Sequence, residues 1–156
     1  MKILLLFLSL LIVTDDATLV TGKGFKGYVF NENQEVFVSL SKGLKRYTPT
    51  YDDIIAAELI IKKSIAKVNS ERMNQQYGCP VIHKKLRKYT RQYVGFINDK
   101  DEKELWVNFV WSSLSFSEQR YKESIISVHD GCSNFWSIRV NINTKNLSDL
   151  KINGVG

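Results

Sequence analysis

The spacing of apolar and polar positions predicts one long helix in the first half of the chain. Apolar residues recur there every three or four positions, with lysines on the other side: Ile54, Ala57, Ile61, Ile65 and Val68. Thr48 before Pro49, or Thr50 with Asp53 three residues later, could cap its start. Gly78 and Pro80 follow its expected end near residues 73–76. We therefore expect a helix of about 25 residues, about 37 Å long at the usual rise.

Alternating patterns on both sides of this helix predict short strands. Two are expected before the helix, over residues 27–30 and 35–40. Five are expected after it, over residues 87–98, 103–112, 121–130, 134–143 and 147–153. The predicted fold class is α+β, with one long helix packed on a four- to five-stranded antiparallel meander sheet.

The first residues have the features of a secretory signal peptide. Lys2 precedes an apolar run over residues 3–13, which is shorter than the roughly 20 residues that a membrane-spanning helix needs. Cleavage after Gly22 fits the small-residue rule better than cleavage after Ala17, which would place Asp15 at a position that favours a small residue. We expect a secreted or periplasmic protein with no membrane span after cleavage. The expected divisions are a signal peptide at 1–22, an N-terminal strand region at 23–46 and an α+β domain at 47–156.

The composition indicates a single globular domain, and the chain has a mild positive net charge. The 156 residues are 44% hydrophobic and 12% aromatic, which is enough to form a core without a disulfide ladder or a structural metal. The 22 Lys and Arg residues outnumber 16 Asp and Glu residues, for a net charge of +6. This balance suits an anionic partner but identifies none.

A basic run interleaved with tyrosines is the main candidate for binding. Strand alternation places Arg87, Tyr89, Arg91 and Tyr93 on one face, which we expect to be exposed. Trp136 is a further candidate, although its alternation with apolar neighbours is typical of a core. Such a surface could stack bases along a phosphate backbone, but an exported protein seldom meets nucleic acid. We expect an unknown protein, glycan or envelope component as the partner, and no nucleic acid.

The two cysteines and two histidines have the spacing of a Cys2His2 zinc site. Cys79 and His83 are four residues apart, and His129 and Cys132 are three apart. In the expected meander, these two pairs lie at opposite ends of strands about 33 Å long. We therefore expect no metal site and consider a Cys79–Cys132 disulfide unlikely on geometry, although export favours oxidation.

His129 beside Cys132 also suggests a base next to a thiol nucleophile. Neighbouring strand residues point to opposite faces, so His129 and Asp130 are poorly placed to orient each other. Asp130 and Gly131 are better interpreted as a hairpin turn, since glycine supplies the positive φ that such a turn needs. No hydrolase elbow, phosphate-binding glycine loop or metalloprotease helix is present in the sequence. We expect no catalytic residue, no cofactor and no enzymatic activity.

The order of elements resembles the cystatin-like fold, in which a sheet wraps around one helix. Over residues 47–154, the strand containing Tyr93-Val94-Gly95, the turn Asp130-Gly131 and the ending Asn153-Gly154 resemble a family of small secreted Bacteroidetes proteins. Cys132 replaces the second glycine of that family's turn. The resemblance implies a fold, an exported location and structural roles for Gly95, Asp130, Gly131, Asn153 and Gly154. It brings no established activity.

The cystatin comparison also brings thiol-protease inhibition as an alternative. The inhibitors carry Gln-x-Val-x-Gly in a hairpin loop, whereas Gln92-Tyr93-Val94-Gly95 is one residue shorter and lies within a predicted strand. We therefore favour an exported, non-enzymatic binding domain of unknown ligand that acts at the cell envelope or outside the cell. An inhibitor and a Cys/His-dependent hydrolase are the alternatives.

Overall fold

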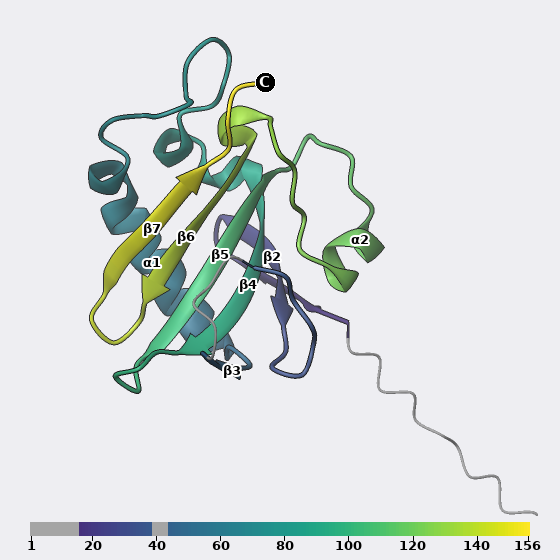
Figure 1. Cartoon of the computed structure of the whole chain (residues 1–156), viewed down its shortest axis with the longest axis vertical. Helices are drawn as coiled ribbons and strands as arrows, with labels where there is room; N and C mark the ends of the chain where they lie inside the picture. The colour runs from purple at the N-terminus through teal and green to yellow at the C-terminus, as the bar shows by residue number, and fades with distance from the viewer. Residues whose placement is uncertain (1–15, 39–43) are drawn as a thin grey trace, which may run out of the picture.

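The computed structural model describes residues 16–38 and 44–156, which form an α+β domain (Figure 1). Helix α1 (Tyr51–Val68) packs on one face of an open sheet, and the short helix α2 (Glu118–Glu123) lies on the other side. The strands described are β1 (Thr18–Gly22), β2 (Phe25–Phe30), β3 (Lys45–Tyr47), β4 (Tyr89–Ile97), β5 (Lys103–Trp111), β6 (Phe135–Asn141) and β7 (Asn146–Ile152). Single 3-10 turns cover Ile82–Lys84, Leu86–Lys88 and Cys132–Asn134. The predicted α+β class, with a helix on a mostly antiparallel sheet, is confirmed.

The sheet contains more strands than the expected meander, in the order β1-β2-β4-β5-β6-β7. Neighbouring strands are antiparallel except β2 and β4, which run parallel. Strand β3 pairs with the far end of β4, beyond β2 and on the same edge. Gly95 makes this pairing possible, because a Cβ there would lie only 2.5 Å from the carbonyl oxygen of Tyr47. Gly95 therefore has a steric role at the contact between β3 and β4.

Helix α1 begins at the second of the two predicted caps. The Thr50 hydroxyl accepts from the Asp53 N–H at 3.2 Å, and the Asp53 carboxylate accepts from the Thr50 N–H at 3.0 Å. The helix ends at Val68, earlier than expected. Buried Asn69 follows it and exchanges two amide hydrogen bonds with Gln75, at 2.8 and 2.6 Å. These bonds satisfy polar groups inside the domain and turn the chain away from the helix axis.

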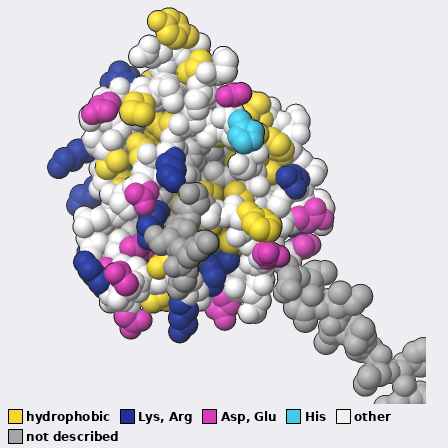
Figure 2. Space-filling view, viewed as in Figure 1, with side chains coloured by type: hydrophobic (Ala, Val, Ile, Leu, Met, Phe, Trp, Pro, Cys, Tyr) yellow, Lys and Arg dark blue, Asp and Glu magenta, His cyan; other side chains and the backbone are white. Residues whose placement is uncertain are grey.

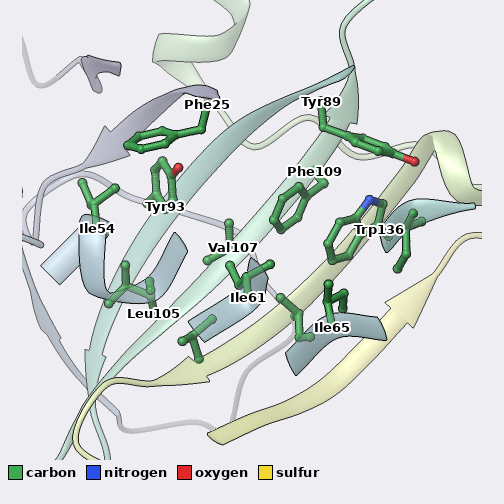
Figure 3. Packing of buried hydrophobic residues seen from close by; sticks show 14 of the residues in the cluster. Phe25, Ile54, Ile61, Ile65, Tyr89, Tyr93, Leu105, Val107, Phe109 and Trp136 are labelled. Atoms are coloured by element: carbon green, nitrogen blue, oxygen red, sulfur yellow. The ribbon is translucent and has the colours of Figure 1, made fainter. Parts of the chain in front are cut away.

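The main core lies between α1 and the sheet (Figure 3). Ile54, Ile61 and Ile65 point from the helix towards the strands and are at most 1% exposed, so the predicted apolar face of the helix is confirmed for these residues. Val68, at the last position of α1, is 40% exposed and was wrongly placed on that face. Phe109 and Trp136 stack with ring centroids 3.6 Å apart on the opposing strands. This packing places Trp136 inside the core.

The predicted strand over residues 121–130 is wrong. The segment contains the end of α2 followed by irregular chain, and it covers the sheet face opposite α1. It still buries Tyr121 and Ile126, but side chains replace the ladder that a strand would need. The Gln92 amide donates to the Tyr121 carbonyl and accepts from the Ile126 N–H, while Asn108 donates to the Ile126 carbonyl. Buried side-chain amides can therefore satisfy the backbone of a segment whose sequence pattern predicts a strand.

Without that strand, both cysteines lie at the same end of the sheet. The chain leaves β5 and enters β6 at the end where Tyr89 pairs with Trp111. Cys79 and Cys132 form a disulfide with Cα atoms 6.2 Å apart. The expectation that geometry would disfavour this bridge was wrong, because one extra strand in the predicted meander placed Cys132 at the opposite end.

The predicted division at residue 22 separates residues that are joined in the structure. Residues 1–15, which contain the apolar run, lie outside the described residues, as do residues 39–43. Ala17, however, is 2% exposed, and its N–H donates to the Lys122 carbonyl at 3.0 Å. Strand β1 then pairs along β2. Cleavage after Gly22, as expected from the sequence, would remove this strand from the domain. The segment 35–38 of the other predicted strand is irregular. Within the described residues, no helix is long and apolar enough to cross a membrane.

A chain lacking residues 1–22 should be less stable than a chain lacking residues 1–15. We expect a difference of about 2 kcal/mol or more in the free energy of unfolding, because Ala17, Val20 and the β1 ladder lose their buried contacts. Urea unfolding of the two chains measures it. Equal stability of the two would show that β1 is dispensable and would restore the boundary after Gly22.

Loss of the disulfide should also lower stability. Closing a loop with a sequence separation of 53 residues contributes about 4 kcal/mol in the chain-entropy model. We expect a Cys79→Ser/Cys132→Ser variant to lose most of this contribution to the free energy of unfolding. Urea unfolding of the variant and of the oxidised protein measures the difference. Alkylation without reductant should modify no thiol in the oxidised protein, and two modified thiols by intact mass would contradict the bridge.

Candidate binding groove

A basic groove lies beside α1, and it is the strongest candidate for a binding site. It has a volume of about 810 Å³ and is bordered by α1, the β1–β2 turn and the segment before β4. Four apolar side chains line it, and we call them its floor: Phe25, Ile55, Leu59 and Leu86. Its rim carries six cations: Lys23, Lys62, Lys84, Lys85, Arg87 and Lys88. We call this site the basic groove and these six residues its rim.

The basic groove contains the whole charge excess of the chain. With Arg91 included, seven of the 22 Lys and Arg residues line it, against Glu58 alone of the 16 Asp and Glu residues. The remaining 15 basic and 15 acidic residues cancel. On the face shown in Figure 2, side chains of both signs lie interspersed. The positive charge is therefore concentrated at one place, which favours the approach of anions there.

A buried ion pair forms the bottom of the basic groove and joins α1 to β4. Arg91 is 1% exposed, and its Nε and Nη2 atoms lie 3.1 and 3.3 Å from the two oxygens of Glu58. Its Nη1 atom also donates to the Tyr89 carbonyl, and its guanidinium lies over the Phe109 ring. The Tyr93 hydroxyl donates to Glu58 at 2.8 Å. Burial and the nearby Glu58 carboxylate raise the pKa of Tyr93 well above its ordinary value, so the phenol stays protonated and keeps this bond.

This pairing leaves the floor electrically neutral. The Glu58 carboxylate occupies the fork of Arg91 that would otherwise bind an anion. His83, which also lines the basic groove, has a pKa below its ordinary value because of burial and the charges of Arg72 and Lys84. Its imidazole is therefore neutral near pH 7. Anionic groups of a ligand would contact the rim, and its uncharged part would contact the floor.

The structure separates the five predicted binding residues. Arg87 is exposed and belongs to the rim. The expectation of an exposed surface was wrong for Tyr89, Arg91 and Tyr93, each at most 1% exposed. Trp136, whose alternation is typical of a core, is also 1% exposed. Strand alternation did place the first three on one face, but α1 covers that face and Glu58 compensates the buried charge. Sequence reasoning missed Lys23, Lys62 and the apolar floor, because only the fold brings these residues to the basic run.

The predicted turn residues hold the chain together near the disulfide. The Asn153 amide donates to the carbonyls of Val128 and Asp130, at 2.7 and 3.1 Å. The Gly154 carbonyl accepts from the Cys132 N–H at 2.8 Å. Gly131 has a φ of 99°, in the left-handed region that glycine adopts easily. Asp130 and Gly131 lead into a 3-10 turn and not between two strands, so the hairpin interpretation was wrong.

The alternative chemical sites lack the geometry that they need. The disulfide uses the Cys132 thiol that a His129 dyad would require, and His129 is exposed. Among residues 16–38 and 44–156, no three His, Cys, Asp or Glu side chains are placed to hold a metal. Gln92, expected in a strand and not in an inhibitory loop, is fully buried within β4.

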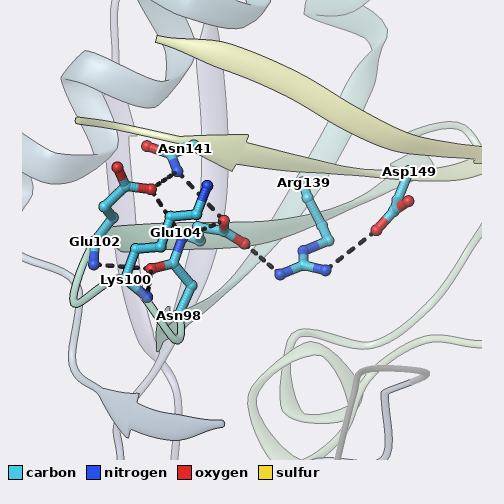
Figure 4. A network of polar contacts seen from close by, with 7 residues as sticks. All are labelled: Asn98, Lys100, Glu102, Glu104, Arg139, Asn141 and Asp149. Atoms are coloured by element: carbon cyan, nitrogen blue, oxygen red, sulfur yellow. Dashed lines mark hydrogen bonds and ion pairs between the residues drawn. The ribbon is translucent and has the colours of Figure 1, made fainter. Parts of the chain in front are cut away.

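A second hollow, of about 880 Å³, lies over the β4–β5 and β6–β7 turns. Two of its acidic groups, Glu102 and Glu104, already have partners within a network of polar contacts (Figure 4). The amides of Asn98 and Asn141 each donate to both Glu102 and Glu104. Arg139 extends the network by pairing with both Glu104 and Asp149. The two Asn hydrogen bonds lower the pKa of Glu102, as expected for a carboxylate whose charge is satisfied. This network stabilises two turns and leaves the basic groove as the better candidate site.

Removing one partner of the buried pair should be strongly destabilising. We expect Glu58→Ala to lower the free energy of unfolding by about 3 to 5 kcal/mol, because Arg91 would remain buried without a counter-charge. A Glu58→Leu/Arg91→Met variant should lose much less, since no charge is left behind. Urea unfolding of both variants measures the difference. A cost below about 1 kcal/mol for Glu58→Ala would mean that water reaches Arg91 and that the pair is not a structural element.

Comparison with protein-family models, with curated proteins and with solved structures finds no match to this chain.

Proposed function

We propose that this protein is an exported, non-enzymatic binding protein that holds an anionic macromolecule of the cell envelope or its surroundings in the basic groove. The observation that carries the proposal is the segregation of charge. The basic groove has an excess of six positive charges, whereas the rest of the sequence sums to zero.

The rim charges are available to a ligand. Within the described part of the chain, none of the six rim cations belongs to an ion pair, although Arg91 beneath them and cations outside the basic groove do form ion pairs. The Glu58–Arg91 pair fixes the floor beneath them. A rigid, neutral floor with unpaired cations around it supports reversible binding, because few groups need to be ordered when the ligand arrives.

Export is supported by two independent features. The apolar run over residues 3–13 after Lys2 has the length of a secretory signal. The Cys79–Cys132 disulfide is of the kind that persists in oxidising compartments such as the periplasm or the exterior. A partner at the envelope, whether a glycan or an acidic protein, follows from this location.

We also retain a divergent cystatin-like fold, and membership of the small secreted Bacteroidetes family, as part of the proposal. The order of one long helix followed by antiparallel strands supports it. The parallel pairing of β2 with β4 and the covering of the second sheet face by residues 112–134 are departures from the expected meander.

The proposal predicts that binding of a polyanion depends on where the positive charges lie. With the sulfated polysaccharide heparin as the probe, Lys84→Glu/Lys88→Glu should weaken binding about tenfold or more, equivalent to at least about 1.4 kcal/mol. Lys100→Glu/Lys145→Glu, which makes the same charge change outside the basic groove, should weaken it much less. Titration calorimetry at several salt concentrations measures both, and binding of the unchanged protein should decrease as salt screens the rim.

Equal weakening by the two double variants would show that net charge alone drives binding. No binding of heparin at low salt would contradict the proposal directly. Circular dichroism of each variant confirms that the fold is retained, which is expected because all four lysines are exposed at the surface.

A further inference from the structure

We infer that the basic groove is built for an acidic peptide segment of a partner protein, in which an apolar side chain is flanked by carboxylates on both sides. This inference rests on the proposed function and assigns a ligand class to the same site. It follows from the position of the apolar floor relative to the rim.

The floor offers an apolar contact that a purely polar ligand would leave unused. Leu59 lies on α1 between Ile55 and Lys62, and it is 62% exposed. Phe25 and Leu86 lie beside it in the same hollow. Because Glu58 already neutralises Arg91 beneath them, the middle of the basic groove attracts an uncharged group rather than an anion. Burying Leu59 against an apolar side chain would contribute to affinity through the hydrophobic effect.

The cations around this floor come from three separate elements. Lys62 comes from α1, Lys23 from the β1–β2 turn, and the other four from residues 84–88. A lipid with one anionic headgroup would pair with one of these elements and leave the others without a partner. A sulfated polysaccharide would pair with all of them but would cover the exposed leucine with polar groups. A peptide with acidic residues on both sides of an apolar one matches both features.

The wall formed by residues 84–88 is already held in one conformation. Its two 3-10 turns are closed by hydrogen bonds from Lys85 to Ile82, at 3.0 Å, and from Lys88 to Lys85, at 2.8 Å. The Lys88 carbonyl then accepts from the Ser112 N–H at 2.8 Å. Arg87 packs beside Gly24, where a Cβ would lie 3.2 Å from its Nε atom. A preformed wall lowers the entropy cost of binding an extended segment.

The test uses three fluorescein-labelled hexapeptides and fluorescence anisotropy with the oxidised protein. The probe is Asp-Glu-Leu-Phe-Glu-Asp. The first control, Asp-Glu-Gly-Gly-Glu-Asp, keeps the charges and removes the apolar centre, and the second, Lys-Lys-Leu-Phe-Lys-Lys, keeps the apolar centre and reverses the charges. We expect the probe to bind about tenfold more tightly than the first control, as burial of two apolar side chains allows, and the second control not to bind.

A pair of matched variants locates the apolar contact. Leu59→Asn should reduce binding of the probe to the level of the Gly-Gly control. Met73→Asn changes a side chain that is equally exposed, at 61% against 62%, but does not line the basic groove, and it should leave binding of the probe unchanged. Both positions are at the surface, so the fold should tolerate either change.

Equal affinity for the probe and the Gly-Gly control, or indifference of the probe to Leu59→Asn, would overturn the inference. Binding to vesicles that contain an anionic phospholipid, without binding of the probe, would also overturn it. In each case, heparin binding that still distinguishes Lys84→Glu/Lys88→Glu from Lys100→Glu/Lys145→Glu would leave the proposed function standing. Failure of that comparison would remove both.

Discussion

The ion pair between Arg91 and Glu58 is the interaction on which the rest of the structure depends. A guanidinium that is 1% exposed is costly unless a carboxylate and further hydrogen bonds compensate it. Glu58 provides that charge from the middle of α1, and Tyr93 adds a hydroxyl from the same strand as Arg91. The pair therefore fixes the position of the helix along the sheet. It also makes the floor of the basic groove neutral, which decides what the groove can bind.

Elsewhere, the domain uses buried side-chain amides where repetitive secondary structure ends. Asn69 and Gln75 close the helix, Gln92 and Asn108 hold the segment after α2, and Asn153 ties the last strand to the loop before β6. The disulfide joins the segment after α1 to this loop. Each amide supplies both a donor and an acceptor, so it can satisfy irregular backbone that no ladder reaches.

The two hollows show how similar residue types lead to different properties. Over the β4–β5 turn, Glu102 and Glu104 are paired with two amides and one arginine. In the basic groove, one carboxylate pairs with the one buried arginine, and the six rim cations have no acidic partner among the described residues. A network of paired groups stabilises turns, whereas an open set of charges over an apolar floor suits recognition. The difference lies in the local balance of charge and not in composition.

The sequence by itself determined the elements whose periodicity is set by their own residues. It placed most of the apolar face of α1, the strands that contain Arg91, Phe109 and Trp136, and the basic run before β4. For the cap of α1 it offered Thr48 or Thr50, and the structure decided for Thr50. Alternation assigns residues to a face but does not show what covers that face, so Tyr89, Arg91 and Tyr93 were expected at the surface. Nor does it distinguish a strand from irregular chain held by amides. The wrong strand over residues 121–130 therefore placed Cys132 at the opposite end of the sheet from its true position. The disulfide, the buried charge and the floor of the basic groove join residues far apart in the chain, and only the tertiary structure decided them.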